Sequence, residues 1–242
     1  MNNNYIYAEI CIEENDINKD TRIINSFEQY KKGKNWEDYE DDKDFENEKE
    51  IKEKCEIKIN DLIIPFSYFY KFKKIGINII QYSFKQNLNR IDFLFCDCKF
   101  LTKIDLSNFN SQNITNIASV FRDCNSLINI NLSNFNTNNV TEMSCLFYGC
   151  SSLMNIDLCS FKTNNTIYLN SIFYGCSSLL TINISNFNIQ NVLDMSLMFY
   201  GCNSLTHANL FNFDNKNEDI EIGGMFSGCN SLIKKDIINI NN

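Results

Sequence analysis

Hydrophobic positions recur every 26 residues along the second part of this chain. Leucine, isoleucine and phenylalanine return in one frame, and cysteine shares that frame at Cys98, Cys124, Cys150, Cys176 and Cys202, with Cys229 one residue late. A fixed period of this length is typical of chains built from stacked repeats, because a single repeat is too small to bury its own apolar side. The pattern therefore predicts a stack of five to six 26-residue coils.

Each repeat has two halves that differ in hydrophobic spacing. In residues 153–158 apolar side chains alternate with polar ones around Asp157, which indicates a half-buried strand. In residues 140–150 they recur at steps of three and four, which predicts a short helical turn. Gly149 lies near the end of this stretch, where glycine can end a helix in the left-handed conformation. The repeats therefore predict an α/β solenoid, with a strand and a short helical turn in each coil.

Two segments carry a family resemblance. NFNTNNVTEMSCLFYGCSSLMNIDL (residues 134–158) and NFNIQNVLDMSLMFYGCNSL (residues 186–205) resemble the BspA-like leucine-rich-repeat surface proteins, and the similarity extends over residues 88–238. The resemblance implies a leucine-rich-repeat solenoid that contacts other molecules, often at a cell surface, and it implies no catalytic residues. The pattern weakens after Leu232, where Lys235 stands in place of an apolar residue, so we expect a C-terminal cap there.

The first 86 residues do not share the period. Alternating apolar residues predict a strand at 5–12, a shorter one at 21–24, a hairpin made of 55–59 and 62–64, and a second strand pair made of 66–72 and 77–84. We therefore assign residues 1–86 to a small β-rich domain that caps the first coil, and residues 87–242 to the repeat array. An independent binding domain is the alternative for the first part.

Charge is concentrated in one segment. The whole chain of 242 residues carries a net charge of −8, and Glu37–Glu53 alone contains ten acidic residues and three lysines. Runs of like charge repel and extend, so we expect a solvated, mobile loop there, and a partner-binding segment is the alternative. The repeats are nearly neutral, which argues against nucleic acid as a partner, because binding a phosphate backbone needs a basic face.

The beginning of the sequence lacks the basic flank and the apolar run of a secretion signal, and no apolar stretch approaches the length of a membrane span. We therefore expect a soluble protein that does not insert into a membrane and that lies inside the cell. Display at the cell surface after unconventional export is the alternative. The pattern leaves the oligomeric state open.

The eleven cysteines raise the question of metal, redox or enzyme chemistry. Cys96 and Cys98 are too close in sequence for a usual zinc-binding pair, and no second ligand pair follows, so we expect no metal and no other cofactor. The repeated cysteines are predicted to be buried thiols that fill the core, with disulfides between coils as the alternative. A cysteine hydrolase with Cys202 as nucleophile and His207 as base is a further hypothesis. Because Cys202 belongs to the repeat frame, we predict no enzymatic activity.

The residues between the buried strand positions form a polar, nearly uncharged face. They suit contact with a protein or a glycan, although asparagine and serine are also ordinary residues of a soluble surface. The predicted binding face consists of Asp105, Asn131, Asp157, Asn183, His207, Asn209 and Phe211. His207 and Phe211 depart from the repeat consensus, so we place the centre of binding there. The sequence thus predicts a non-catalytic interaction scaffold that binds a protein partner or a glycan, with a surface adhesin as the alternative.

Overall fold

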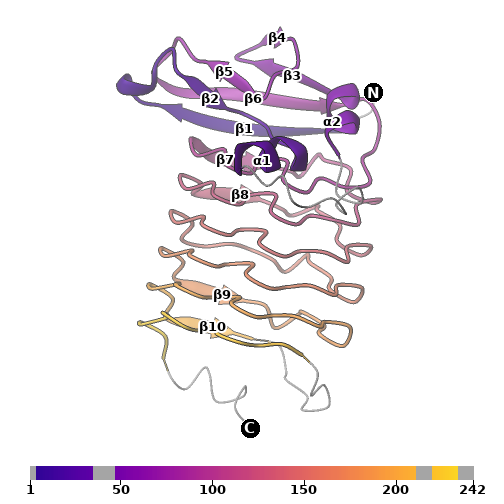
Figure 1. Cartoon of the computed structure of the whole chain (residues 1–242), viewed down its shortest axis with the longest axis vertical. Coiled ribbons are helices and arrows are strands. Elements are labelled where there is room, and N and C mark those ends of the chain that lie inside the picture. The colour runs from indigo at the N-terminus through magenta and orange to yellow at the C-terminus, as the bar shows by residue number, and fades with distance from the viewer. Residues whose placement is uncertain (1–3, 35–46, 211–219, 234–242) are drawn as a thin grey trace.

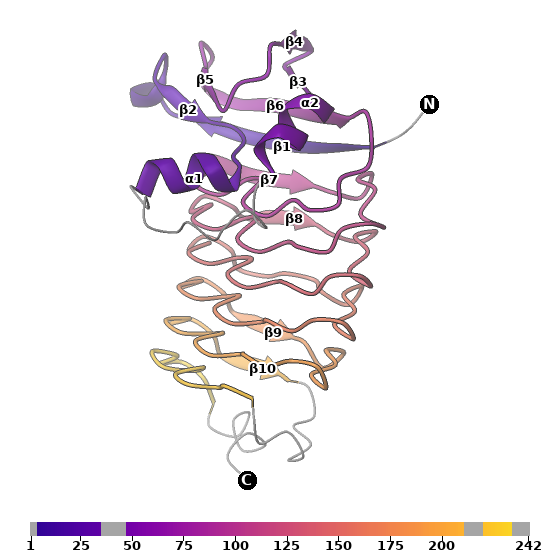
Figure 2. The same cartoon turned by 45° about the vertical axis from the view of Figure 1, so that its right-hand side comes forward.

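The computed structural model describes residues 4–34, 47–210 and 220–233. Figure 1 shows an elongated body, with the residues before the repeats at one end and the coils stacked below them toward the C-terminus. Figure 2, turned by 45°, shows the same order of coils. Coils that follow one another in the sequence are therefore also neighbours in space.

Before the repeats, the described residues contain six strands and two α-helices. The elements are β1 (Tyr5–Ile12), the 3-10 turn η1 (Glu14–Asp16), β2 (Asp20–Arg22), α1 (Phe27–Lys34), α2 (Glu48–Lys54), β3 (Cys55–Ile59), β4 (Leu62–Ile64), β5 (Phe69–Lys71) and β6 (Gly76–Phe84). The predicted strands at 5–12, 55–59, 62–64 and 77–84 are confirmed to within one residue. Alternating apolar residues located β1, β3 and β6, because one side of each strand is buried.

That six-stranded sheet joins the N-terminal part to the first coils. Its strand order is β4-β3-β6-β1-β7-β8, in which β7 (Leu101–Asp105) and β8 (Asn129–Asn131) belong to the repeats. Strand β1 pairs with β7 in antiparallel register, so that Ala8 lies opposite Ile104, and both side chains are buried. The first coil therefore gains backbone hydrogen bonds from β1 on the side that faces away from the other coils.

The predicted strand pair made of residues 66–72 and 77–84 is wrong. Strand β5 pairs with β2 in a small two-stranded sheet, whereas β6 lies between β1 and β3. A central strand forms hydrogen bonds on both sides, and β6 carries fully buried Ile80 and Tyr82 that suit this position. The side chains of β5 are exposed or half-buried, and such a strand fits a sheet edge.

The prediction of a loop throughout Glu37–Glu53 is also wrong. Residues 35–46 lie outside the described part of the chain, but Glu48 begins helix α2, which includes the rest of the segment. Ile51 is fully buried, and the ion pairs of Lys52 with Glu48 and of Lys54 with Glu50 join residues one turn apart at 2.5 Å each. Opposite charges four residues apart support a helix, whereas the count of charges suggested only repulsion.

The predicted fold class, an α/β leucine-rich-repeat solenoid, is wrong. In the described residues the only α-helices are α1 and α2, and both precede the repeats. The strands of the coils do not form one sheet through the repeats, because β7 and β8 join the six-stranded sheet and β9 (Thr181–Asn183) and β10 (His207–Asn209) form a separate parallel pair. Residues 153–158, in the coil between these groups, form no assigned strand. The fold therefore consists of mixed sheets with few helices.

Hydrogen bonds between coils explain why the predicted helical turn at 140–150 does not form. Along this stretch, one set of backbone N–H groups donates to the carbonyl three residues earlier, as Leu146, Tyr148 and Cys150 do. The residues between them donate instead to the next coil, as Met143, Cys145, Phe147 and Gly149 do. A helix would need all these groups for its own bonds. The apolar steps of three and four therefore come from successive turns, and the predicted left-handed conformation of Gly149 is confirmed at φ 71°.

Rings and thiols from neighbouring coils stack in the core. The ring of Phe147 lies 5.5 Å from that of Phe121 and 5.6 Å from that of Phe173, centroid to centroid, and the planes are within 11° of parallel. The Cys150 thiol is buried and donates a hydrogen bond to the Phe121 carbonyl at 3.1 Å. The prediction of buried, free thiols is confirmed for Cys98 through Cys202 of the repeat frame, whereas Cys229 is half-buried. Cysteine thus both fills the core and links coils.

Candidate interaction face

An exposed face runs across the coils on the side of β7, β8, β9 and β10 (Figure 2). It consists of three columns of residues, each repeated at the 26-residue period. The edge stripe is Thr102, Ile128, Met154, Leu180 and Thr206; the open column is Lys103, Asn129, Asn155, Thr181 and His207; and the turn column is Asp105, Asn131, Asp157, Asn183 and Asn209. The three columns lie side by side because each coil contributes one residue to each of them.

The turn column is partly occupied by its own backbone. Asp105 Oδ1 accepts a hydrogen bond from the Ser107 N–H at 2.8 Å, and Asp157 Oδ1 accepts one from the Cys159 N–H at 2.9 Å. Asn131 makes the same bond, to the residue two positions later. Side-chain oxygens that bond the backbone two residues on are typical of turns. The column therefore fixes the corner of each coil and presents only its remaining atoms to a ligand.

The carboxylates of the turn column are held in the ionised form. Partial burial alone would raise the pKa of Asp105, but hydrogen bonds from Ser107 and Asn131 hold this pKa below its usual range. The Cys159 N–H does the same for the pKa of Asp157. Bonds to the charged form of a carboxyl group favour that form. These two groups are the negative charges of the turn column.

The open column offers unpartnered polar groups. Asn129, Asn155 and Thr181 are exposed, and their side chains form no hydrogen bond within the described part of the chain. Lys103 at one end pairs with Glu9 of β1 at 3.0 Å. His207 at the other end is exposed, and its Nδ1 lies 3.0 Å from Thr206 Oγ1. This column thus presents neutral donors and acceptors at a regular spacing set by the backbone of the coils.

The edge stripe is the main feature that sequence reasoning missed. Its three central residues are apolar and exposed, with 55% of Ile128, 50% of Met154 and 43% of Leu180 accessible. The threonines at its ends are half-buried. The signal was present in the sequence, because these residues directly follow the repeated leucines.

The structure brings six of the seven predicted site residues onto this face. Asp105 and Asn131 are half-buried, and Asp157, Asn183, His207 and Asn209 are exposed. Phe211, the predicted centre of binding together with His207, lies outside the described residues. The binding role of these residues stays a prediction, and within the turn column it rests on the atoms that the turns leave free.

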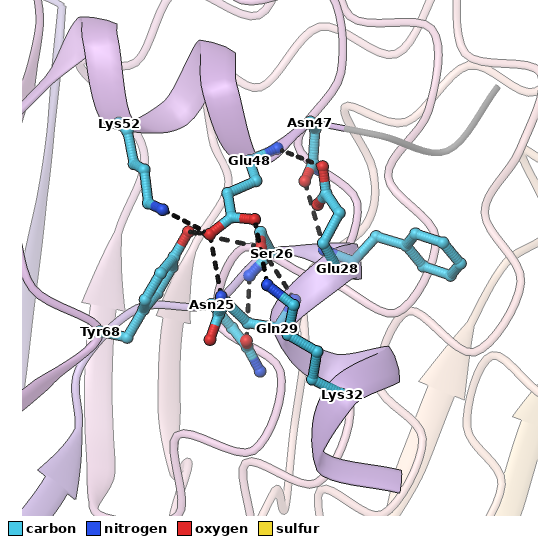
Figure 3. Close-up of polar contacts among 10 residues, drawn as sticks. Asn25, Ser26, Glu28, Gln29, Lys32, Asn47, Glu48, Lys52 and Tyr68 are labelled. Atoms are coloured by element: carbon cyan, nitrogen blue, oxygen red, sulfur yellow. Dashed lines mark hydrogen bonds and ion pairs between the residues drawn. The ribbon is translucent and has the colours of Figure 1, made fainter. Parts of the chain in front are cut away.

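A second polar cluster lies between the two helices and has a structural role (Figure 3). The Glu48 carboxylate accepts hydrogen bonds from Gln29 at 2.9 Å and from the Tyr68 hydroxyl at 3.0 Å, in addition to its pair with Lys52. Burial alone would raise the pKa of Glu48, but these bonds hold this pKa below its usual range. Asn47 donates to the backbone carbonyl of Asp92 at 2.7 Å, which fastens the start of α2 to the first coil. The cluster therefore positions α1 and α2.

The residues of the hydrolase hypothesis lie in different environments. The Cys202 thiol is fully buried and donates to the Phe173 carbonyl at 3.1 Å. A hydrogen bond with Cys229, together with burial, raises the pKa of Cys202, which disfavours the reactive thiolate. His207 is exposed on the open column. The geometry therefore gives the hydrolase hypothesis no support.

Within residues 4–34, 47–210 and 220–233, no three histidine, cysteine or acidic side chains are grouped so that they could hold a metal ion. The same part of the chain has no helix with the length and apolar character needed to cross a membrane.

Comparison with known proteins matches the chain to a family model over two overlapping ranges. Residues 66–180 and 128–240 each match the model of the family described as "Mycoplasma protein of unknown function, DUF285". No curated protein and no solved structure matches the chain. The two overlapping matches cover the coils and the last strands before them, and they agree with the repeated frame of the sequence.

Proposed function

The chain belongs to the family described as "Mycoplasma protein of unknown function, DUF285", and on that premise we propose that it is a non-catalytic interaction protein that binds a protein ligand on the interaction face. One observation carries the proposal: the open column presents exposed, neutral side chains without partners on a regular backbone. Such groups both donate and accept hydrogen bonds, and a rigid backbone lowers the entropy lost on binding.

The charge of the face also supports a neutral ligand surface. Lys103 is paired with Glu9, so the open column contributes little net charge. The turn column adds the carboxylates of Asp105 and Asp157. A basic stripe that could neutralise phosphates is missing from these columns, which disfavours nucleic acid. A glycan is the second candidate ligand, because asparagine and threonine side chains pair well with sugar hydroxyls.

Matched variants test the proposal. The combined variant Asn129→Ala, Asn155→Ala and Thr181→Ala removes the free groups of the open column. Its control replaces another column of exposed, neutral amides, Gln112, Asn138 and Asn164, with alanine. Ligands are identified with the parent chain by affinity capture and on a panel of immobilised glycans, and each purified ligand is then titrated against the three proteins.

We expect the open-column variant to bind at least about tenfold more weakly, since each lost hydrogen bond costs about 0.5–1.5 kcal/mol, whereas the control binds as the parent does. Equal binding by all three proteins would place the ligand site elsewhere and contradict the proposal. Binding to sugars alone would replace the protein ligand with a glycan.

We also propose that the chain serves as a surface-displayed contact protein, in the manner of BspA-like surface repeat proteins. The support is the repeated segment at 134–158 and 186–205 together with the family match. Labelling of intact cells with a reagent that does not cross membranes, followed by recovery of the chain, tests this role. A chain that is labelled only after lysis would be an intracellular interaction protein.

A further inference from the structure

We propose that the edge stripe is a self-association surface, on which a second copy of this chain packs face to face and antiparallel about a two-fold axis through Met154. The proposal does not depend on ligand binding by the open column. It rests on the symmetry of the stripe, on the absence of charge around it and on its backbone spacing.

The stripe has the same chemistry in both directions from Met154. One coil away on either side are two exposed aliphatic side chains, Ile128 and Leu180. Two coils away on either side are two half-buried threonines, Thr102 and Thr206. A contact between identical copies about a two-fold axis requires a surface that is complementary to its own reverse. In the proposed pair, Met154 lies against Met154, and Ile128 of each copy lies against Leu180 of the other.

Uncharged columns border the stripe on both sides. On one side lie the half-buried serines Ser126, Ser152 and Ser178, and on the other lie Asn129, Asn155 and Thr181. The centre of a protein interface is depleted of charge, because ionised groups lose their hydration there. The three coils around Met154 meet this condition over three columns: the serines, the edge stripe and the open column.

Backbone hydrogen bonds set the spacing of three of the four steps along the stripe. The N–H of Ile128 donates to the carbonyl of Thr102 at 2.9 Å, that of Leu180 to Met154 at 3.0 Å, and that of Thr206 to Leu180 at 2.9 Å. Each of these steps is therefore close to the distance between hydrogen-bonded strands, about 4.8 Å. The step from Ile128 to Met154 has no such bond within the described residues. A second copy of the chain has the same period of coils, so its side chains can pack between those of the first.

The size of the surface predicts a weak dimer. The stripe extends over four steps between coils of about 4.8 Å each, and the contact is about six residues of about 3.3 Å wide along the strand direction. These lengths give a footprint of roughly 400 Å² per copy, or roughly 800 Å² in total. Specific interfaces bury about 1,200–2,000 Å², and smaller ones are transient. We therefore expect a dimer whose population rises with protein concentration.

One residue opposes the dimer. The proposed axis runs along the chain direction of residues 154–157, so that the two Asp157 carboxylates approach each other across it. Asp157 is exposed at the rim of the contact, where solvent weakens but does not remove the repulsion. Asp157→Asn should therefore strengthen the dimer, and this expectation is specific to the antiparallel arrangement about Met154.

Cross-linking of single cysteine variants tests the arrangement. In the full chain with Cys159→Ser, which removes the exposed thiol of this face, Met154→Cys is treated with a short bismaleimide. We expect a covalent dimer. The Ile128→Cys variant by itself and the Leu180→Cys variant by itself should give little covalent dimer. A mixture of the two variants should give a covalent dimer that contains one chain of each. Efficient cross-linking of Ile128→Cys to itself, or no dimer from Met154→Cys, would overturn the proposal.

Sedimentation over a concentration series provides an independent measurement. Met154→Asp should weaken dimerisation at least about tenfold, because it places two unpaired charges at the axis. Leu193→Asp is the matched control, since Leu193 is 53% exposed but lies outside the three columns, and it should dimerise as the parent does. Thermal unfolding of each variant confirms that it is folded.

The sedimentation results also separate this inference from the proposed function. A parent chain that stays monomeric at the highest concentration would overturn the dimer and leave ligand binding by the open column intact. Loss of ligand capture in Met154→Asp without any self-association would assign the stripe to a different partner, and it would equally overturn the proposal.

Discussion

Replacement of Asp92 with asparagine should raise the stability of the protein at neutral pH. The Asp92 side chain is fully buried; its Oδ1 pairs with Arg90 Nε at 2.6 Å, and its Oδ2 has no hydrogen-bond partner within the described residues. Burial raises the pKa of Asp92 to about 6 from an ordinary value of 3.8, against the opposing attraction of Arg90. Burial outweighs the ion pair here because half of the carboxylate is left without compensation.

The sign of the effect follows from the two protonation equilibria. The folded chain binds the Asp92 proton more tightly than the unfolded chain does, since the pKa is raised on folding. The resulting stabilisation is complete below a pH of about 4 and is lost as the pH rises through about 6. A difference of about two pKa units corresponds to about 3 kcal/mol. Asparagine cannot ionise, so at neutral pH the free energy of unfolding of Asp92→Asn should exceed that of the parent by up to about this amount.

Urea unfolding at several pH values between about 4 and 7.5 measures the difference in free energy of unfolding between parent and variant. Asp61→Asn, which removes a carboxylate that is 95% exposed, controls for the change in net charge. If the difference between Asp92→Asn and the parent is independent of pH, or if the parent gains stability over the variant as the pH rises, the ion pair with Arg90 outweighs burial and the reasoning is refuted.

Three further predictions concern the coils and their covering. Cys150→Ala should lower the free energy of unfolding by about 1–3 kcal/mol, because it leaves a cavity and removes the hydrogen bond to the Phe121 carbonyl. Cys150→Ser should lower it less, because the serine hydroxyl can donate to the same carbonyl. A larger loss for Cys150→Ser than for Cys150→Ala in urea unfolding would contradict this prediction. Phe147→Ala should cost about 3–5 kcal/mol, and Phe226→Ala should cost less because Phe226 is only partly buried and has one stacked neighbour. Deletion of residues 1–84 should expose the edge of β7 and cause aggregation, visible by light scattering; a monomeric product with an unchanged Tm would identify an independent domain.

The sequence located elements wherever one apolar face decided the conformation. Strand β1 has Ile6, Ala8, Ile10 and Ile12 on its buried side, and a period of two is unambiguous for a strand in a half-exposed sheet. The same reasoning misassigned residues 140–150. Steps of three and four suit both a helix and a series of turns, and only the hydrogen bonds to the next coil exclude the helix.

Only part of the candidate face was predicted, because the sequence does not show the contacts that form between distant residues. Asp105 and Asp157 were recognised as outward-facing residues, but their bonds to the backbone two residues on depend on the shape of the corner. The sequence shows that Ile128, Met154 and Leu180 repeat at the 26-residue period, but this repetition does not show whether an apolar residue beside a buried leucine points inward or outward. Exposure is a property of the packed coils, and it decided which residues form the edge stripe.

The sequence by itself determined the 26-residue frame, the buried thiols of that frame and the main strands of the N-terminal sheet, because each of these depends on a local pattern of apolar residues. Tertiary structure decided the partners: β6 between β1 and β3, β5 against β2, and the backbone of residues 143–150 against the next coil. Hydrogen bonds between segments distant in sequence have no periodic signature along the chain. They fixed the class of the fold and the surface that it presents.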